Sequence, residues 1–309
     1  TTSVERPADE RQQLAWSPVC VGSGDGSHRL SVVGYLRGPR PPGVECERPL
    51  LVVCREPSCG SSKVWACSNH RESRCKPCAG RYRRRLVRVA ETGMRHDGRE
   101  HRGYMYLLTV TAPGSGQHLD TRSGTICPCT PAGGTDLGTW NAGHSARWNH
   151  LRTNLARDYD GMQYLRAVEV QLRGALHDHA ILWSPIPLGL EHVRSRAIAA
   201  GFGHSVDLAP IVPGSRKAAY YVAKYVTKAC DSREQVPWTV DKLDRETGEL
   251  VAVQLESAPF RTWSSSRAWG ITMKAVRAAV RASITRAPEP PAPDPAPPAV
   301  PPVPPPSSA

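Results

Sequence analysis

Two tyrosines and two lysines recur in one short segment of this chain, Tyr221-Val-Ala-Lys224-Tyr225-Val-Thr-Lys228. If residues 216–230 form a helix, both tyrosines and the second lysine share one face, because positions three and four apart are neighbours. A tyrosine hydroxyl can attack a phosphodiester when a nearby ammonium group lowers its pKa or stabilises charge at phosphorus. The alternative interpretation is a surface helix with amphipathic tyrosines.

A second pattern, formed by Glu169 and the run His177-Asp178-His179, has the residue types of a metal site. Two histidines at i and i+2 of a strand project to the same face. If residues 172–174 form a three-residue hairpin loop, with its glycine in the left-handed conformation, residue 169 pairs with residue 177. Directly opposite residues share a face, so the glutamate and both histidines would converge. A two-residue loop would place Glu169 opposite Asp178 and break the site.

Two imidazoles, one carboxylate and open coordination positions suit Mg²⁺ or Mn²⁺. Such an ion, acting as a Lewis acid, would polarise a scissile phosphate. The alternative is ordinary use of half-buried histidines on a strand. The aligned glutamate and the tyrosine segment downstream favour the metal site.

The spacing of the cysteines predicts a structural zinc site. Five of the ten cysteines fall within residues 54–78, and in a cytoplasmic protein such a cluster indicates metal binding more than disulfides. The expected ligands are two closely spaced pairs: Cys54, Cys59, Cys75 and Cys78. Cys67 or His70 is a substitute ligand, and unconnected thiols are the alternative. Cys127-Pro-Cys129, with His118 and His144 nearby, is a weaker candidate because one intervening residue is tight for two ligands of one ion.

The charge of the chain points to a polyanionic partner. Lys and Arg number 40 against 28 Asp and Glu, which gives a formal net charge of +12 over 309 residues. Such a field attracts nucleic acid or an anionic membrane surface. No apolar run reaches the roughly 20 residues of a membrane span, and no signal-peptide pattern opens the chain. We therefore expect a cytoplasmic protein directed to nucleic acid.

Arginines follow the cysteine run directly, in a segment with helical spacing of its apolar residues. A basic helix behind a zinc module is a reasonable phosphate-contacting element, although a solvated charged face is the alternative. The expected DNA-binding residues are these arginines: Arg81, Arg83, Arg84, Arg85 and Arg88.

Composition and periodicity divide the chain into four parts. We expect a poorly ordered N-terminal segment (1–49), a Cys-rich zinc module with a basic helix (50–95), a nicking and strand-transfer domain (96–286) and a disordered proline-rich tail (287–309). Within the third part, the pattern predicts strands, helices and one hairpin, over residues 104–111, 164–172, 175–183 and 205–212 (strands), 190–200 and 264–285 (helices) and 232–260 (hairpin).

Three segments resemble, in the expected order, the motifs of the HUH endonuclease superfamily, specifically the rolling-circle replication initiator (Rep) proteins of actinobacterial plasmids. Residues 107–113, LLTVTAP, are similar to the first Rep motif, and residues 173–179, RGALHDH, to the second. Residues 221–228, YVAKYVTK, are similar to the third, especially to its two-tyrosine form in gene A proteins of small single-stranded DNA phages. The similarity covers roughly residues 50–285.

The resemblance implies an α+β fold, the HUH endonuclease fold, with a central antiparallel sheet flanked by helices and an N-terminal Cys-rich zinc module. It implies that His177 and His179 bind the ion and that Glu169 is the acidic ligand. Tyr225 matches the principal nucleophile of the family, and Tyr221 matches the second tyrosine of the two-tyrosine members.

Two further expectations follow from the resemblance. Lys224 and Lys228 would help to orient the phosphate and the tyrosines. The residue between the histidines is usually apolar in the family, whereas here it is Asp178. It should point to the opposite face of the strand, so we expect catalysis to survive while the packing beneath the strand differs.

The function implied by the resemblance is metal-dependent DNA nicking and strand transfer that starts rolling-circle replication of a plasmid through a 5′-phosphotyrosine. The expected partners are plasmid origin DNA, single-stranded or as an extruded hairpin, and a host polymerase. A host helicase is also expected, because the chain has no Gly-x4-Gly-Lys-Ser/Thr motif. The alternatives are a two-tyrosine HUH transposase, a conjugative relaxase (which usually places the tyrosine before the histidines) and a zinc-dependent DNA-binding regulator.

Overall fold

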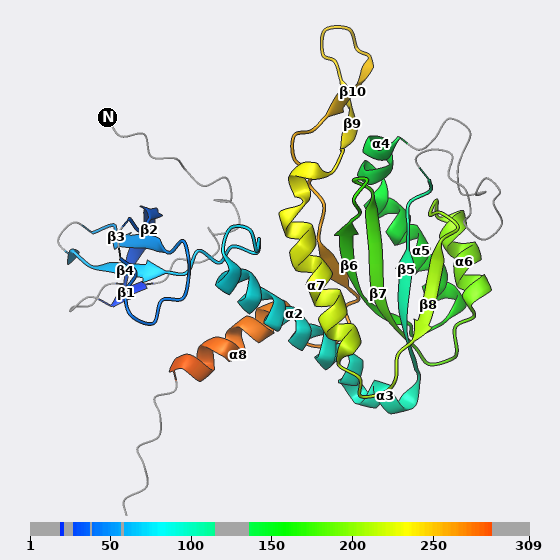
Figure 1. The fold of residues 1–309 in the computed structure, drawn as a ribbon, viewed down its shortest axis with the longest axis horizontal. Helices are drawn as coiled ribbons and strands as arrows, with labels where there is room; N and C mark the ends of the chain where they lie inside the picture. Colours follow the sequence, from blue (N-terminus) through cyan, green and yellow to red (C-terminus); the bar gives the residue numbers. More distant parts are fainter. Residues whose placement is uncertain (1–18, 22–26, 38, 57–58, 115–135, 286–309) are drawn as a thin grey trace, which may run out of the picture.

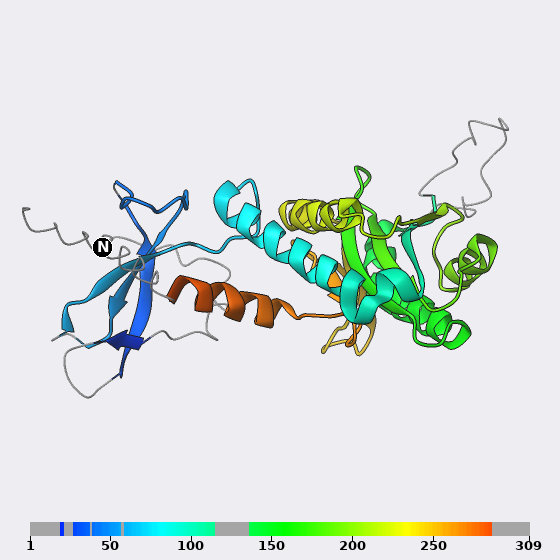
Figure 2. The same cartoon turned by 90° about the horizontal axis from the view of Figure 1, so that it is seen from below.

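The computed structural model describes residues 19–21, 27–37, 39–56, 59–114 and 136–285. A four-stranded sheet lies at the N-terminal end, and a larger domain with a five-stranded sheet lies at the other (Figure 1). The long helices α2 (Lys76–Arg95) and α8 (Met273–Thr285) lie side by side between them (Figure 2). None of the described helices is long and apolar enough to cross a membrane.

The five-stranded sheet is antiparallel throughout, in the order β11-β6-β7-β5-β8. Its strands have these bounds: β5 Tyr104–Val110, β6 Gln163–Val170, β7 Leu176–Ser184, β8 Val206–Pro210 and β11 Trp263–Ser265. The central strand β7 is buried on both faces, which explains why its sequence is almost continuously apolar outside the segment His177–His179.

Helices cover both faces of this sheet. On one face, α4 (Leu137–Ala142), α5 (His144–Asp158) and α6 (Leu190–Ala199) pack in one core cluster with Leu108 and Leu182 of the sheet. On the other face, α2 and α7 (Lys217–Asp231) pack in a second cluster with Leu165 and Ile181 (Figure 1). The remaining short elements are η2 His96–Gly98, α3 Arg99–Arg102 and η3 Arg233–Gln235.

The N-terminal sheet begins earlier than the sequence indicates. It has the order β1-β2-β3-β4, with bounds Val19–Val21, Ser27–Tyr35, Leu50–Cys54 and Ser62–Trp65. Strands β1 and β2 fall inside the segment expected to be poorly ordered, so the sheet crosses the expected boundary after residue 49. The reason is long-range pairing: β2 is stabilised by ladder bonds to β3, a partner that the local composition does not reveal. Residues 1–18 and the proline-rich tail lie outside the described residues.

At the C-terminal end, the expected helix over residues 264–285 is shorter than predicted. Residues Trp263–Ser265 form the edge strand β11, paired with β6, and the helix begins only at Met273. Edge pairing overrides the helical spacing because it satisfies the backbone groups of β6 on that side. The expected hairpin within residues 232–260 is confirmed as β9 (Thr239–Leu243) and β10 (Leu250–Gln254).

Candidate metal and tyrosine site

The hairpin of β6 and β7 has the predicted register. Gly174 has a φ of 83°, in the left-handed region, and the Gln171 amide donates to the Ala175 carbonyl at 2.9 Å. The loop therefore has three residues, and Glu169 stands directly opposite His177. The register expected from the loop length is confirmed.

This register brings Glu169, His177 and His179 together. One ligand atom from each lies within 4.8 Å of the others, and Glu169 Oε2 is 3.0 Å from His179 Nε2. Both histidines are buried, while the carboxylate is partly open to solvent. The donor set fits a small divalent ion that keeps positions for water and phosphate oxygen, as the sequence predicts.

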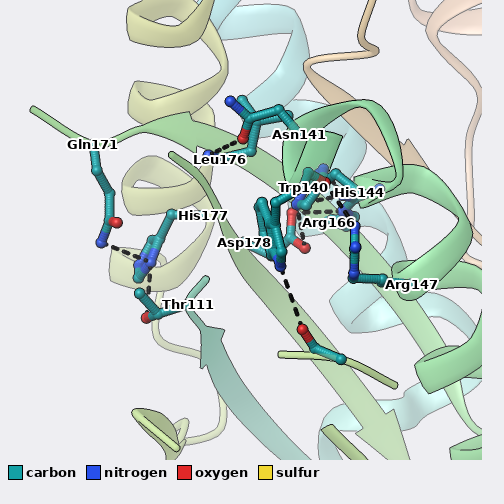
Figure 3. A network of polar contacts seen from close by, with 11 residues as sticks. Thr111, Trp140, Asn141, His144, Arg147, Arg166, Gln171, Leu176, His177 and Asp178 are labelled. Atoms are coloured by element: carbon teal, nitrogen blue, oxygen red, sulfur yellow. Dashed lines mark hydrogen bonds and ion pairs between the residues drawn. The ribbon is translucent and has the colours of Figure 1, made fainter. Parts of the chain in front are cut away.

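Two threonines of β5 and its following residue hold the imidazole rings from behind. Thr111 Oγ1 lies 3.0 Å from His177 Nδ1, and Thr109 Oγ1 lies 3.2 Å from His179 Nδ1. The Gln171 amide also contacts His177 Nδ1, at 3.3 Å (Figure 3). In the tautomer whose Nδ1–H donates to threonine, Nε2 keeps the lone pair that a metal needs. Sequence reasoning gave these threonines no role, although their i, i+2 spacing on a strand could have shown it.

Helix α7 places both tyrosines over the metal-ligand cluster. The Tyr225 ring stacks on His179 with centroids 4.2 Å apart, and the Tyr221 ring meets His179 edge-on at 5.1 Å. The two phenol rings are 4.7 Å apart. Val222 and Val226 face the core, so the apolar stripe of the helix fixes which side the tyrosines occupy.

The lysines of α7 extend the same cluster. Lys228 Nζ lies 2.5 Å from Glu169 Oε1, which ties the last turns of the helix to β6. The ammonium groups of Lys224 and Lys228 lie 5.9 and 5.8 Å from the centroid of the Tyr225 ring. Both positive charges therefore lie close to the phenol that stacks on the metal-ligand cluster.

The electrostatics of the site keep the ligands ready for a metal. Burial lowers the pKa of His177 to about 4 and also lowers the pKa of His179. Burial opposes ionisation of Glu169, but the hydrogen bonds from Lys228 and His179 outweigh it and hold the carboxyl pKa below its usual value. At neutral pH the imidazoles are thus neutral and the carboxylate is charged, the forms that bind metal. Burial and contact with Tyr225 raise the pKa of Tyr221 to about 12.

Asp178 points away from the metal-ligand cluster, as expected, and enters a buried ionic network. Arg166 Nε donates to Asp178 Oδ1 at 2.7 Å, and His144 Nε2 lies 3.0 Å from Asp178 Oδ2. Figure 3 shows Asp178 directed toward Arg166 and His144, while His177 is directed toward Thr111. Burial alone would raise the pKa of Asp178, but Arg166 and His144 lower it to about 2. The network anchors the strand between the two histidines on its opposite face.

Asn141 supports the hairpin loop. Its side-chain amide donates to the carbonyls of Gly174 and Pro237, at 3.0 and 2.9 Å, and its oxygen accepts from the Leu176 amide at 3.0 Å. The residue is fully buried, so each of these bonds satisfies a group that water cannot reach. Nothing in the local sequence distinguishes this asparagine from a surface residue of a helix.

The cysteine cluster contains a different first pair from the one predicted. The structure gathers four buried sulfurs within 4.8 Å of one another: Cys46, Cys67, Cys75 and Cys78. Cys46 and the substitute ligand Cys67 thus take the places expected for Cys54 and Cys59, and His70 stacks on Tyr82 rather than joining the sulfurs. Cys54 belongs to β3 and Cys59 donates to Ser61, so the pairing of β3 directs these two cysteines away from the cluster.

The geometry of the four sulfurs fits a tetrahedral ion. Neighbouring sulfurs are 3.6 to 3.7 Å apart, close to the edge of about 3.8 Å that a tetrahedron with Zn–S bonds of about 2.3 Å requires. The hydrogen bond from Cys67 lowers the pKa of Cys78 to about 4, and Arg81 Nη2 donates to its sulfur at 3.0 Å. Cys78 is therefore a thiolate, the form that binds metal.

The weaker metal candidate of the sequence receives no support from its one described member. His144 belongs to the ionic network beneath β7, where it contacts Asp178 and Arg166. Its partners in that candidate, Cys127, Cys129 and His118, lie outside the described residues.

The five arginines predicted to bind DNA have different surroundings. Arg81 contacts Cys78 and lies 3.5 Å from Glu45, while Arg83 pairs with Glu72 at 2.8 Å. Arg84 and Arg88 are exposed on α2, and Arg85 is half-buried. The exposed members remain the best placed for phosphate contacts. Trp140 and Trp148 pack in the core and are not available for stacking on bases.

Removal of the Asp178 carboxylate should be strongly destabilising. In Asp178→Ala, the Arg166 charge stays buried without its partner, so we expect a loss of about 3–5 kcal/mol in the free energy of unfolding by urea. Asp160→Ala, which removes an exposed carboxylate, is the control and should change this free energy by less than about 0.5 kcal/mol. Equal stability of the two variants would contradict the network.

Loss of the Thr111 hydroxyl should weaken metal binding. Thr111→Val keeps the shape of the side chain but removes the group that orients His177, so we expect about 10–100-fold weaker binding of Mn²⁺. Thr111→Ser retains the hydroxyl and serves as the matched control, with affinity close to that of the unaltered protein. Titration followed by electron paramagnetic resonance measures both, and identical affinities for the two variants would rule out the orienting role.

Comparisons with known proteins agree with this geometry. Residues 134–230, which contain the hairpin and α7, match the model of a family of replication-associated proteins, the ORF2 family. A protein of Streptomyces ambofaciens named replication initiator protein is 25% identical over 333 residues, covering 83% of this chain and 70% of that protein. No solved structure matches. The resemblance predicted from the three motifs is therefore confirmed, and through residues 134–230 this chain is a relative of the ORF2 family of replication-associated proteins.

Proposed function

We propose that this protein is a metal-dependent DNA endonuclease and strand transferase with the HUH fold, which starts rolling-circle replication of a plasmid. The observation that carries the proposal is the stacking of Tyr225 on His179, 4.2 Å between ring centroids. It places a phenol beside a three-ligand metal-binding cluster, so that one phosphate can contact both. The name of the Streptomyces relative, replication initiator protein, supports the same conclusion.

Glu169, His177 and His179 would hold Mg²⁺ or Mn²⁺, which supplies Lewis-acid polarisation of the scissile phosphate. Tyr225 Oη attacks the phosphorus atom, and the bond from phosphorus to the 3′-oxygen breaks. The phenol proton is lost and the departing 3′-oxygen gains one, which leaves a 5′-phosphotyrosine and a free 3′-hydroxyl. Lys224 and Lys228 lie near enough to the phenol to offset the charge that develops there.

Tyr221 is the second nucleophile in this proposal. Its ring lies 4.7 Å from that of Tyr225, so a phosphate bound to one tyrosine stays within reach of the other. With its pKa raised to about 12, Tyr221 remains a neutral phenol during the first cleavage. It then carries out the transfer that closes the circle, and because the phosphotyrosine conserves the bond energy, neither step consumes a nucleotide.

The partners follow from the same proposal. Origin DNA, single-stranded or extruded as a hairpin, binds the basic surface of the chain, with Arg84 and Arg88 on α2 as phosphate contacts. A host helicase and polymerase unwind and copy the plasmid from the free 3′-hydroxyl. The rival enzyme, a two-tyrosine transposase, would cleave transposon ends rather than an origin. A zinc-dependent DNA-binding regulator would bind without cleaving.

A structural Zn²⁺ at the cysteine cluster completes the proposal. Cys46, Cys67, Cys75 and Cys78 surround a space of tetrahedral geometry and are all buried. A closed four-thiolate site leaves no open position for substrate, so this ion would stabilise the fold rather than take part in the cleavage.

The tyrosine assignment is tested with a labelled origin oligonucleotide and Mn²⁺. Tyr225→Phe removes the attacking oxygen and should reduce nicking by more than about 10³-fold. Tyr221→Phe should retain the first cleavage but lose the closing transfer. Tyr220→Phe, on the neighbouring exposed tyrosine of the same helix, is the matched control and should cleave normally. Nicking that survives in Tyr225→Phe would refute the assignment, and nicking without a divalent ion would refute the metal site.

The zinc proposal is tested by metal analysis of the purified protein. We expect one zinc ion per chain, which Cys46→Ser should lose because it breaks the tetrahedral set. Cys54→Ser alters a cysteine outside the cluster and should retain the ion. The reverse outcome, with zinc lost only from Cys54→Ser, would favour the ligand set expected from the sequence.

A further inference from the structure

The segment between Cys67 and Cys75 meets the C-terminal end of the tyrosine helix. Asp231, the last residue of α7, accepts hydrogen bonds from the backbone amides of Glu72 and Ser73, at 3.0 and 3.1 Å. It also accepts from the Ser73 hydroxyl at 2.5 Å. We call residues 68–74 the ligand loop, because both of its flanking residues belong to the cysteine cluster.

This contact compensates a carboxylate placed at an unfavourable position. The C-terminal end of a helix carries partial negative charge, so an aspartate there is repelled by the helix carbonyls. Three donors from the ligand loop offset that repulsion, and the contact also satisfies two backbone amides of the loop. A second contact, from Arg71 Nη1 to Glu234 Oε1 at 2.7 Å, joins the same two segments just beyond the helix.

The ligand loop has little else to fix its shape. Glu72, Ser73 and Arg74 are exposed, and Ser68 adopts a left-handed φ of 53°, which is uncommon for a residue other than glycine. Its internal bonds are short turns, such as the Cys75 amide donating to the Arg71 carbonyl at 3.1 Å. The buried cysteines at its two ends are therefore the anchors that determine where its amides point.

At the other end of this chain of contacts lies the candidate active site. Lys228 stands one turn before Asp231 on α7 and pairs with Glu169 at 2.5 Å. Tyr225 precedes Lys228 by three positions and stacks on His179. A shift or fraying of the last turn of α7 would therefore move the ammonium group away from a metal ligand and loosen the phenol beside it.

We propose that the cysteine cluster positions the tyrosine helix: its ligand loop holds the last turn of α7 through Asp231, which makes Asp231 a positioning residue for Lys228 and Glu169. The inference rests on the proposed zinc site and, for its effect on cleavage, on the proposed nicking activity. Zinc at the four cysteines thereby supports not only its own module but also the geometry of a site on another sheet.

Hydrogen–deuterium exchange on the full chain tests the coupling without reference to activity. Removal of zinc by a chelator should speed exchange of the amides in the last turn of α7 by about tenfold, the effect of losing one charged hydrogen bond. Asp231→Asn in the zinc-loaded protein should do the same, and chelation should add little to it, because both act through one contact. The first turn of α7 is the internal reference, and Asp241→Asn, on the exposed β9 strand, is the matched control.

Two results would overturn the inference: unchanged exchange at the end of α7 in zinc-free protein, or effects of chelation and Asp231→Asn that simply add. If chelation unfolds the whole module, Ser73→Ala in the loaded protein replaces it, and faster exchange confined to the last turn is then expected. Absence of that change would equally exclude the coupling.

A nicking arm with saturating Mn²⁺ follows the consequence for the active site. Asp231→Asn should lower the single-turnover rate about tenfold with little change in DNA affinity, whereas Asp241→Asn should leave both unchanged. If the unaltered protein does not nick, the proposed function fails while the exchange measurements still decide the coupling. If it nicks and Asp231→Asn nicks equally fast, the positioning role fails alone.

Discussion

The register of the β6–β7 hairpin determines which side chains can reach one ion, and the rest of the site depends on it. Successive residues of a strand point to opposite faces, so a slip of one residue would exchange Asp178 with the two histidines. Three features hold the register: the left-handed Gly174, the buried amide of Asn141 and the ionic network beneath the strand. The metal-ligand cluster therefore depends on interactions on both faces of the sheet.

The two faces of β7 show opposite solutions to burying charge. On one face, Asp178 is fully buried with Arg166 and His144, where each polar group has a close partner and no opening to solvent. On the other, Glu169 stays partly open and Lys228 reaches it from an exposed position. A closed network stabilises a single geometry, whereas an open one leaves room for ion and phosphate.

Helix α7 connects the two parts of the molecule. Its apolar stripe packs with α2 and the sheet, its polar face carries the tyrosines, and its last residue binds the loop of the cysteine cluster. Helix α2 begins at that cluster and runs beside α7, so the N-terminal module is joined to the core of the larger domain (Figure 1). The position of the tyrosines is thus determined by packing and by a polar contact at the helix end.

The sequence by itself determined the local parts: the three-residue loop, the pairing of Glu169 with His177, and the face of α7 that bears Tyr221 and Tyr225. Period-two and period-3.6 patterns encode these, because they concern residues that are close along the chain. Only the tertiary structure decided that Cys46 joins the cysteine cluster, and that Asp231 holds its loop. These contacts join residues far apart in the chain, and no local periodicity specifies which distant donor will meet a given acceptor.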